Sequence, residues 1–541
     1  MNRDAKPAAN TRLSPWTAFV RNEDGTILFF AVVLMLLMLM LAGMGVDIMR
    51  FETTRNELQQ TLDRATLASA SITQDLDPEA VVRDYFDKAG LSDQLKDVRV
   101  TTGMNFRTVA AEARADTNPI FLRLYQTEVV DQIEARAFSE AEQRITNVEI
   151  ALVLDVSGSM GGAKLTNLKT AAKEFVRTVL EADGEGRISI FIVPYNGQVN
   201  MSQEMQNLFI NRTNDHNVTD VNCFDLPSSV YSGLGLPITT TMPVTGHVDT
   251  FSSTSYSTSY VSATGSSATP NPANRWCLQS TNNVILPATN VISRLENHID
   301  GLTAGGATSI NAGMKWGMAL LDPESRAITS AMVATGRTPA QFAGRPYNYV
   351  DNEAMKVVVL MTDGEHFAEE RLNSGYRTED SPIFKGSDGY YSLYQNRANT
   401  SNDYWVPHRN EWRSQPWPDS TRAARQKWNQ VWENLRMTWV AWQLYARANG
   451  NSSSVYYSTM DMFRSKTATT DMDSQLQGVC NRARDNDVIV YGIAFEAPAN
   501  GQAQIQACST TPSHYFNAAG LEIQSAFRAI ASNISQLRLT Q

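Results

Sequence analysis

The first strong pattern along the chain is an apolar segment at positions 25–46, which carries no charged side chain over about 22 residues. A helix of roughly 20 apolar residues is long enough to cross the hydrocarbon layer of a membrane. Asp47 and Arg50 follow directly, where a cleavable signal sequence would carry small residues. The pattern therefore predicts a transmembrane helix that stays attached to the rest of the chain.

Helical periodicity continues beyond the apolar segment. Small and apolar residues recur there at the spacing of one helix face: Leu58, Leu62, Ala65 and Ser69. This spacing predicts one long helix that leaves the membrane and ends near residue 73. Residues 98–102 and 108–114 then alternate apolar and polar side chains, which predicts strands. We expect a helix plus a small pilin-like α+β region over residues 47–146.

From residue 147 onwards, apolar runs typical of buried strands alternate with amphipathic segments typical of helices. The predicted strands are residues 148–155, 187–194, 356–362 and 488–495, and the predicted helices are residues 164–181, 289–300, 309–321, 472–484 and 519–535. Strands that alternate with helices favour a mostly parallel sheet covered on both faces. The pattern predicts an α/β, doubly wound domain over residues 147–541.

Two long stretches, residues 196–287 and 366–470, do not follow this alternation and are predicted to be insertions. Residues 228–272 of the first insertion are rich in Ser, Thr, Gly and Tyr. Long segments of this composition are usually functional or disordered, so we expect a solvated, partly ordered excursion. The second insertion begins directly after Asp363, a position from which it would shape access to that residue.

A stripe of tryptophans marks the second insertion. Residues 420–448 are predicted to form a helix that ends at Gly450. Steps of four and three residues alternate along one face of this helix, through Trp428, Trp432, Leu435, Trp439, Trp442 and Ala446, so that four tryptophans share one stripe. An aromatic stripe at helical spacing ordinarily packs inside a protein, but tryptophan is also enriched at binding hot spots. Two hypotheses therefore stay open, an internal packing face and a partner docking face.

Charge and cysteine content narrow the class of protein. The chain has 541 residues and a formal net charge of -10, which argues against nucleic acid as a partner because phosphate binding needs a basic face. The four cysteines show no metal-binding C-x-x-C spacing. Pairing between neighbours in sequence would join Cys223 to Cys277 and Cys480 to Cys508, although three connectivities and reduced thiols are alternatives. Disulfides would indicate an oxidising compartment.

Three loops of the α/β domain carry oxygen ligands. Asp155, Ser157 and Ser159 follow the first strand, Thr308 ends a Gly-rich loop before a helix, and Asp363 follows a second buried strand. Loops at the carboxyl ends of strands are the usual ligand sites of open α/β sheets. Hydroxyls with few carboxylates suit Mg²⁺, with Mn²⁺ and Ca²⁺ as alternatives. Asp, Ser and Gly are also ordinary turn residues, so a fold that binds no metal is the competing interpretation.

These five residues, in this order and context, resemble the metal-ion-dependent adhesion site (MIDAS) of von Willebrand factor A domains. The resemblance implies that the two serines and the threonine contact the ion directly or through water, and that the two acids complete its shell. Ser309 and Thr303 lie close enough in sequence to be alternatives to Thr308. The resemblance also implies that a partner supplies a carboxylate as the last ligand of the ion.

The arrangement of the whole chain resembles TadG-like proteins of tight-adherence pilus systems. The resemblance rests on residues 21–25 before the span, residues 45–47 and Arg50 after it, and the closing segment from Cys480 to residue 531. It implies a bacterial inner-membrane protein with a short cytoplasmic tail, residues 1–24, and its bulk in the periplasm or on the cell surface. No glutamate stands at the fifth place after Gly25, so we expect no pilin-like cleavage.

Motifs for catalysis are absent from the sequence, which contains no H-E-x-x-H, P-loop or G-x-S-x-G pattern. We therefore expect a non-catalytic, metal-dependent binding or adhesion component of a pilus assembly apparatus. The alternatives are a structural envelope scaffold with an idle metal site and, less directly, a metal-activated hydrolase.

Overall fold

The computed structural model describes residues 26–71, 76–102, 106–122, 133–144, 147–181, 183, 186–253, 256–278, 282–351 and 354–540. The expected cytoplasmic tail, residues 1–24, lies outside the described residues. The chain divides into two compact units, residues 1–145 and 146–540. Each unit has a hydrophobic core of its own.

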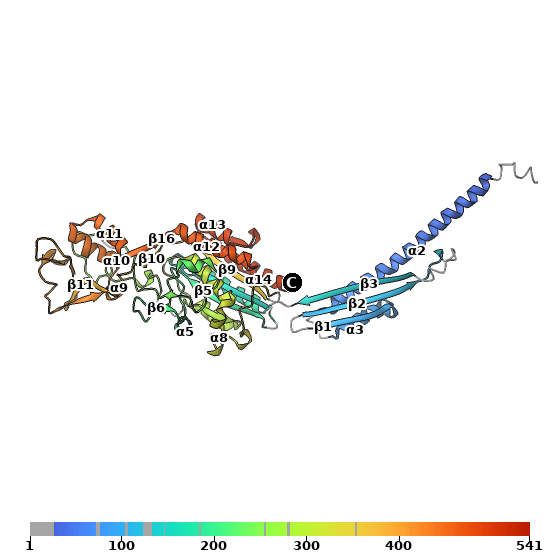
Figure 1. Ribbon diagram of the computed structural model, residues 1–541, viewed down its shortest axis with the longest axis horizontal. Helices are drawn as coiled ribbons and strands as arrows, with labels where there is room; N and C mark the ends of the chain where they lie inside the picture. The colour runs from blue at the N-terminus through green and yellow to red at the C-terminus, as the bar shows by residue number, and fades with distance from the viewer. Residues whose placement is uncertain are drawn as a thin grey trace, which may run out of the picture. The chain divides into compact units, whose positions relative to one another are not determined.

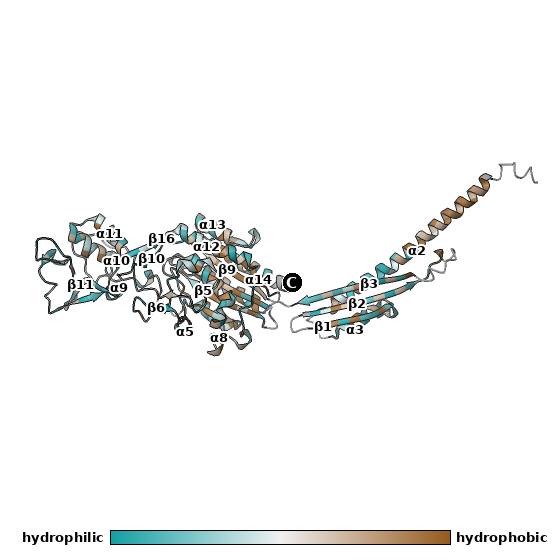
Figure 2. Cartoon of the chain, viewed as in Figure 1, coloured by the Kyte–Doolittle hydropathy of each residue, from teal (hydrophilic) through white to brown (hydrophobic). Residues whose placement is uncertain are grey.

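The first unit begins with one helix of 44 residues, α2 (Thr26–Ser69). The side chains of its apolar N-terminal half are mostly exposed, and Figure 2 shows this half as a brown segment. Among the described residues, α2 is the one helix long and apolar enough to cross a membrane. The structure confirms that the helix continues without interruption past the apolar segment.

The C-terminal half of α2 packs on a three-stranded antiparallel sheet in the order β1 (Leu95–Thr102), β2 (Phe106–Thr117) and β3 (Ile133–Arg144). Helix α3 (Pro78–Lys88) adds Phe86 to the core, where it joins Leu58 of α2. Asp47 is buried because its carboxylate accepts the backbone N–H groups of residues 120–122. The two predicted strands are confirmed, and β3 is an additional strand that the sequence pattern did not reveal.

A six-stranded sheet forms the centre of the second unit (Figure 1). Its strands are, in spatial order, β18 (Tyr515–Ala518), β17 (Ile489–Phe495), β9 (Ala354–Thr362), β4 (Asn147–Asp155), β5 (Ile188–Tyr195) and β8 (Leu286–Thr289). Neighbouring strands run parallel except β8, which pairs antiparallel with β5 at the edge. This sheet confirms the predicted doubly wound, von Willebrand factor A-type fold.

Helices cover both faces of this sheet. Every residue of β4 is buried, and alternate residues face opposite sides: Leu152 joins one core cluster and Val153 the other. The first face carries α4 (Ala163–Glu181), α6 (Ile292–Gly301) and α14 (Glu522–Thr540), and the second carries α7 (Ile310–Leu321), α12 (Thr469–Asp485) and α13 (Ala499–Cys508). The structure adds α8 (Arg326–Ala334) and α13, which were not predicted. Residue 289 was predicted to be helical but ends β8, where it pairs with Ile190.

The first insertion is not the solvated excursion that its composition predicted. Met201, Phe209, Phe224 and Leu236 are buried in the core of the α/β domain. Its regular elements are short: α5 (Gln203–Asn207), β6 (Arg212–Thr213), η5 (Ser228–Ser232), β7 (Met242–Pro243) and η6 (Pro272–Asn274). The expectation was wrong because scattered apolar residues, rather than a periodic pattern, anchor this insertion.

The second insertion leaves and re-enters the domain through an antiparallel ribbon of β10 (Glu369–Leu372) and β16 (Arg464–Thr467). Beyond the ribbon lies a five-stranded sheet in the order β14 (Glu411–Arg413), β13 (Tyr404–Val406), β12 (Tyr391–Tyr394), β11 (Asp380–Gly386) and β15 (Ala423–Lys427). The helical segments are α9 (Trp428–Asn434), α10 (Met437–Trp439), the π-helix η9 (Val440–Ala446), η10 (Arg447–Asn449) and α11 (Ser453–Phe463). Val248, Ala263 and Trp276 of the first insertion join this core, so both insertions fold together.

The tryptophan stripe packs inside this joint core. Trp428, Trp432, Trp439 and Trp442 are each at most 4% exposed. The indole N–H groups of Trp432, Trp439 and Trp442 also have internal partners; Trp439, for example, donates to the carbonyl of Val261 at 3.1 Å. The hypothesis of a partner docking face on these four residues is therefore wrong. The first insertion contacts Trp439 and Trp442, and Tyr376 and Phe463 of the second insertion pack on Trp428 and Trp432.

The predicted helix over residues 420–448 is also broken. Residues 423–427 form β15, and Leu435 and Arg436 have extended backbone. The backbone N–H of Arg436 donates to the carbonyl of Ala268 at 2.7 Å, which joins the break to the first insertion. Gly450 ends the segment with a φ of 72°, as expected of a helix C-terminus.

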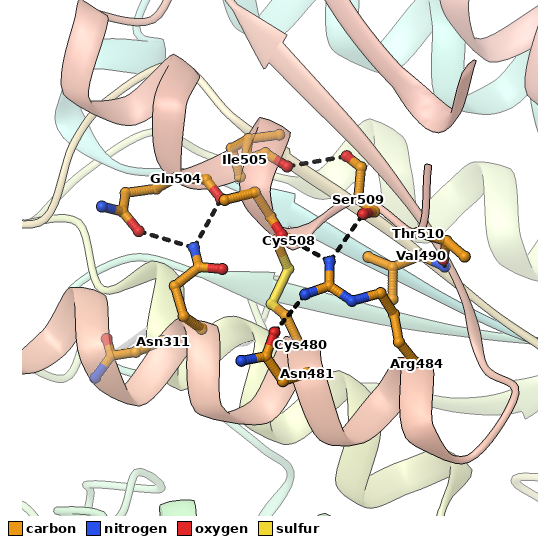
Figure 3. Close-up of a disulfide and its surroundings, with 12 residues drawn as sticks. Asn311, Cys480, Asn481, Arg484, Val490, Gln504, Ile505, Cys508, Ser509 and Thr510 are labelled. Atoms are coloured by element: carbon orange, nitrogen blue, oxygen red, sulfur yellow. Dashed lines mark hydrogen bonds between the residues drawn. A yellow bond between two sulfur atoms is a disulfide. The ribbon is translucent and has the colours of Figure 1, made fainter. Parts of the chain in front are cut away.

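Both predicted disulfides are present. Cys223 joins Cys277 within the first insertion, and Cys480 of α12 joins Cys508 of α13. Figure 3 shows the second bond between the two helices, with Arg484 of α12 donating to the carbonyl of Ser509 at 3.0 Å. Both bridges close loops between segments that are neighbours in sequence.

Candidate metal centre

The loops with the predicted oxygen ligands open at one edge of the central sheet. β4 and β9 run parallel and side by side, with Leu154 opposite Met361. Asp155 is the last residue of β4, and Asp363 follows the last residue of β9. Both carboxylates therefore emerge at the carboxyl ends of neighbouring strands, where open α/β sheets bind ligands.

Asp155 is fully buried and held by two hydrogen bonds. Its Oδ1 accepts the backbone N–H of Ser157 at 2.8 Å, and its Oδ2 accepts the hydroxyl of Thr362 at 2.7 Å. An ionised carboxylate has roughly four lone-pair positions, so these bonds leave it able to accept further interactions. The two bonds fix the orientation of the carboxylate towards the loop that follows β4.

A line of oxygen atoms connects this loop with Asp363. The hydroxyls of Ser157 and Ser159 are 3.0 Å apart, and Ser159 Oγ donates to Asp363 Oδ1 at 2.7 Å. Ser157 and Asp363 are buried, whereas Ser159 is exposed. The arrangement therefore reaches from the sheet edge to the surface.

Thr308 approaches the same place from the Gly-rich loop before α7. A Cβ added to Gly364 would lie 3.5 Å from Thr308 Oγ1 and 3.9 Å from Ser159 Oγ, so both hydroxyls flank Gly364. The carbonyl of Gly306 accepts the backbone N–H of Gly158 at 3.0 Å, which binds the Gly-rich loop to the serine loop. Gly306 has a φ of 82°, a conformation that favours glycine.

The hydroxyls of the two alternatives to Thr308 have different environments. The backbone N–H and the hydroxyl of Thr303 both donate to Asn283 Oδ1, at 2.9 and 3.4 Å. Ser309 precedes α7 and its hydroxyl is buried with no hydrogen-bond partner. The structure thus brings together all five predicted ligand residues, with Thr308 as the threonine that faces Gly364.

Burial and the negative charge of Asp363 shift the pKa of Asp155 in the same direction. Removal from water, followed by repulsion from Asp363, raises the pKa of Asp155 to about 6, although the hydrogen bonds from Ser157 and Thr362 lower it. Two carboxylates at one sheet edge therefore favour a positive charge beside them. A bound divalent cation would stabilise the ionised form of Asp155.

One cation at this edge comes from the chain itself, and the sequence analysis missed it. Lys164 Nζ donates to Asp363 Oδ2 at 2.9 Å and lies 3.8 Å from Glu496 Oε2. Lys164 is on the first turn of α4, which follows the serine loop. A lysine in the helix turn directly after a ligand loop is the signal that could have found it, because such a side chain lies near the helix N-terminus.

The residues present fit a hard divalent cation. They are two carboxylates and three hydroxyls, which are the oxygen ligands that Mg²⁺ prefers, and Mn²⁺ and Ca²⁺ accept the same types. Across the described part of the chain, no group of three or more His, Cys, Asp or Glu side chains is placed to hold a metal ion. Metal binding here would accordingly depend on Ser157, Ser159 and Thr308 as much as on the acids.

A histidine close to this edge has a structural environment. His366 Nδ1 is 2.6 Å from Asp473 Oδ1, and its Nε2 accepts the backbone N–H of Asn311 at 3.0 Å. Its side chain is completely buried. Because both ring nitrogens are engaged, His366 joins the start of α7 to α12.

Comparison with protein families finds one match. Residues 25–71 match the family described as "Putative Flp pilus-assembly TadE/G-like". The matched residues cover the apolar segment and the continuation of α2. The resemblance expected for the N-terminal region is thereby confirmed. No curated protein sequence matches the chain.

Several solved structures of pilus proteins are similar to the chain at low identity. The von Willebrand factor domain of the type V pilus tip protein Mfa5 from Porphyromonas gingivalis is 12% identical, with a TM-score of 0.31. The match covers 73% of this chain and 97% of the Mfa5 domain. The pilus adhesin SpaC from Lactobacillus rhamnosus GG is 10% identical, with a TM-score of 0.28 and coverages of 82% and 33%. The pilus adhesin RrgA from Streptococcus pneumoniae is 10% identical, with a TM-score of 0.30 and coverages of 81% and 49%. The fold assignment rests on the strand order given above.

Proposed function

We propose that the protein is a membrane-anchored, exported and metal-dependent adhesion component of a tight-adherence pilus apparatus, and that it is non-catalytic. The TadE/G-like match over residues 25–71 supports the pilus context. The long apolar helix α2 supports an anchor with a short cytoplasmic tail and the bulk of the chain outside the inner membrane. The two disulfides support an oxidising compartment.

The single observation that carries the adhesion role is the convergence of five oxygen-bearing side chains at one sheet edge, with an exposed hydroxyl at its outer end. Asp155, Ser157, Ser159, Thr308 and Asp363 would hold the ion. When bound, an ion with few anionic ligands stays electrophilic and accepts a carboxylate from a partner protein. In this proposal, the partner would make that contact at the outer surface beside Ser159.

A genetic experiment tests this function. Cells that produce Asp155→Ala in place of the natural protein should lose attachment to a surface, while pilus assembly and the amount of protein stay unchanged. The matched control is Asp461→Ala, which removes an exposed aspartate of α11 at a distance in sequence from all ligand loops. Retained attachment in Asp155→Ala cells would contradict the adhesion role.

The Lys164 to Asp363 ion pair favours a second candidate, a structural scaffold with an idle metal site. An ammonium group at 2.9 Å already neutralises the carboxylate of Asp363. Under this alternative, Asp155→Ala would leave attachment unchanged or lower the amount of folded protein. Measuring protein level alongside attachment separates the two candidates.

A further inference from the structure

A partly exposed apolar surface lies next to the candidate metal centre. It consists of Phe251 and Leu278 from the first insertion and Phe367 from the start of the second, and we call it the apolar shelf. Phe367 is 43% exposed, and Phe251 and Leu278 are half-buried. Phe251 packs against the core that contains the tryptophans, but the shelf differs from that core in that its own members are partly exposed.

Backbone contacts fix the shelf to the ligand loops. The N–H of Phe367 donates to the carbonyl of Thr308 at 2.9 Å, so this aromatic residue is one hydrogen bond away from a predicted ligand. A Cβ added to Gly305 would lie 3.4 Å from Leu278 Cδ1, which places Leu278 against the same Gly-rich loop. Phe367 and Leu278 are therefore each bound or packed against the Gly-rich loop that carries Thr308.

A buried tryptophan supports the exposed rings from below. The ring centroid of Phe367 is 5.2 Å from that of Phe251 and 6.1 Å from that of Trp276. Trp276 is 1% exposed and its indole N–H donates to Thr250 Oγ1 at 2.9 Å. Phe367 is thus held on a rigid base, which reduces the entropy that a side chain loses when it becomes part of an interface.

We propose that the apolar shelf binds the apolar residue next to the acidic residue that a partner presents to the metal. This inference rests on the proposed function and adds the chemical class of the partner: a protein segment in which Asp or Glu is flanked by a large apolar side chain. The spacing supports the occupant, because the metal-facing hydroxyl and the shelf-facing carbonyl belong to one residue, Thr308. In an extended segment, the side chains on one face belong to alternate residues roughly 6.6 Å apart, so an apolar side chain next to the acid on that face can lie on the shelf while the acid faces the metal.

Charge complementarity also favours such a segment. The outer end of the metal centre combines the predicted cation with Lys164, whose side chain is one-quarter exposed and pairs with Asp363. Both would attract a carboxylate, whereas the shelf offers only apolar atoms to the neighbouring side chain. A segment with acidic and apolar residues side by side matches this surface better than a purely acidic one.

Synthetic peptides provide the probe. Short peptides carry a single aspartate flanked either by leucine and phenylalanine or by glycine and serine, and they are titrated into the full-length protein in detergent with Mg²⁺ present. Wild-type protein should bind the apolar-flanked peptides at least about tenfold more tightly, as expected from burying part of one apolar side chain. Phe367→Ala should remove most of this difference, and Phe367→Leu should restore part of it.

Two controls make the outcome decisive. Tyr457→Ala removes a 62% exposed aromatic residue of α11 and should leave the preference unchanged. Mg²⁺ titration of each variant should give the wild-type affinity, since Phe367 contributes no ligand. Three outcomes would overturn the shelf proposal while leaving the metal site intact, provided that wild-type protein binds Mg²⁺. They are equal binding of apolar-flanked and polar-flanked peptides, no binding of any peptide, and a preference that Phe367→Ala retains. If wild-type protein binds no Mg²⁺, the proposed function itself fails.

Discussion

Lys164 Nζ lies 2.9 Å from Asp363 Oδ2, across 199 positions of the chain. This ion pair places a positive charge on one of the two carboxylates to which a divalent cation would bind. Like charges at such a distance repel each other most strongly where water is excluded. The lysine would therefore lower the affinity of the centre for a metal ion.

Replacing this charge provides the first prediction. Lys164→Met retains most of the aliphatic chain and removes the ammonium group, so Mg²⁺ should bind about tenfold more tightly. Calorimetric titration measures the change. Lys169→Met is the matched control on the same helix, because Lys169 donates to the carbonyl of Asp300 and not to a ligand residue. Weaker Mg²⁺ binding by Lys164→Met would show that the lysine supports the metal centre instead of opposing it.

The pKa of Asp155, raised to about 6 by burial and by Asp363, predicts a pH dependence of metal binding. A metal ion must displace the proton that Asp155 carries at low pH. The apparent affinity for Mg²⁺ should therefore fall about tenfold between about pH 7.5 and about pH 5. Titrations at both pH values in the same salt check this, and a constant affinity across this range would count against Asp155 as a ligand.

In the metal-free protein, the ionisation of Asp155 should lower the stability of the fold as the pH rises, which is opposite to the pH trend of metal affinity. Since the folded-state pKa of Asp155 is higher than the ordinary value of an aspartate, its stabilising contribution is fully present below about pH 4 and is lost as the pH rises through about 6. Asp155→Asn mimics the protonated form and should raise the melting temperature of the metal-free protein at neutral pH. A lower melting temperature in this variant would indicate that the ionised carboxylate is already compensated.

Trp439 should be important for stability and not for partner binding. It is completely buried between the two insertions, and its indole N–H donates to the carbonyl of Val261. Trp439→Ala should lower the free energy of unfolding by about 3–5 kcal/mol, the usual cost of removing a large aromatic side chain from a core. Urea unfolding followed by tryptophan fluorescence measures this, with Tyr457→Ala expected to change it by no more than about 0.5 kcal/mol. An unchanged unfolding curve for Trp439→Ala would contradict the joint core.

The regular part of the fold could be predicted from the sequence because β4 and β9 are continuous apolar runs with a predicted ligand residue at or directly after the last position. Such runs are typical of strands buried on both faces, and Asp155 and Asp363 could be placed at their ends by pattern alone. The boundaries of α4, α7 and α12 were predicted within a few residues from the amphipathic pattern of these segments.

The structure of the insertions could not be predicted from the sequence pattern, because contacts between segments that are distant in sequence determine it. Asp249 accepts the backbone N–H groups of Ser252 and Asn271, and its backbone carbonyl accepts the N–H of Met437. Nothing in the Ser- and Thr-rich composition around Asp249 signals this network. The alternation in steps of four and three residues correctly marked a common buried face for the tryptophans, but the break at Arg436 depends on a carbonyl of the first insertion. Lys164 was missed because its partner is in another loop.

Calorimetric titration of Mg²⁺ into the full-length protein, beside Asp155→Ala with an unchanged circular dichroism spectrum, tests the central claim most directly. The account predicts saturable binding by the natural protein and its loss in the variant, since Asp155 is one of two carboxylates that converge with three hydroxyls at the sheet edge. Absence of binding in both proteins, or equal binding by both, would contradict a metal-dependent adhesion site and leave the scaffold as the better account.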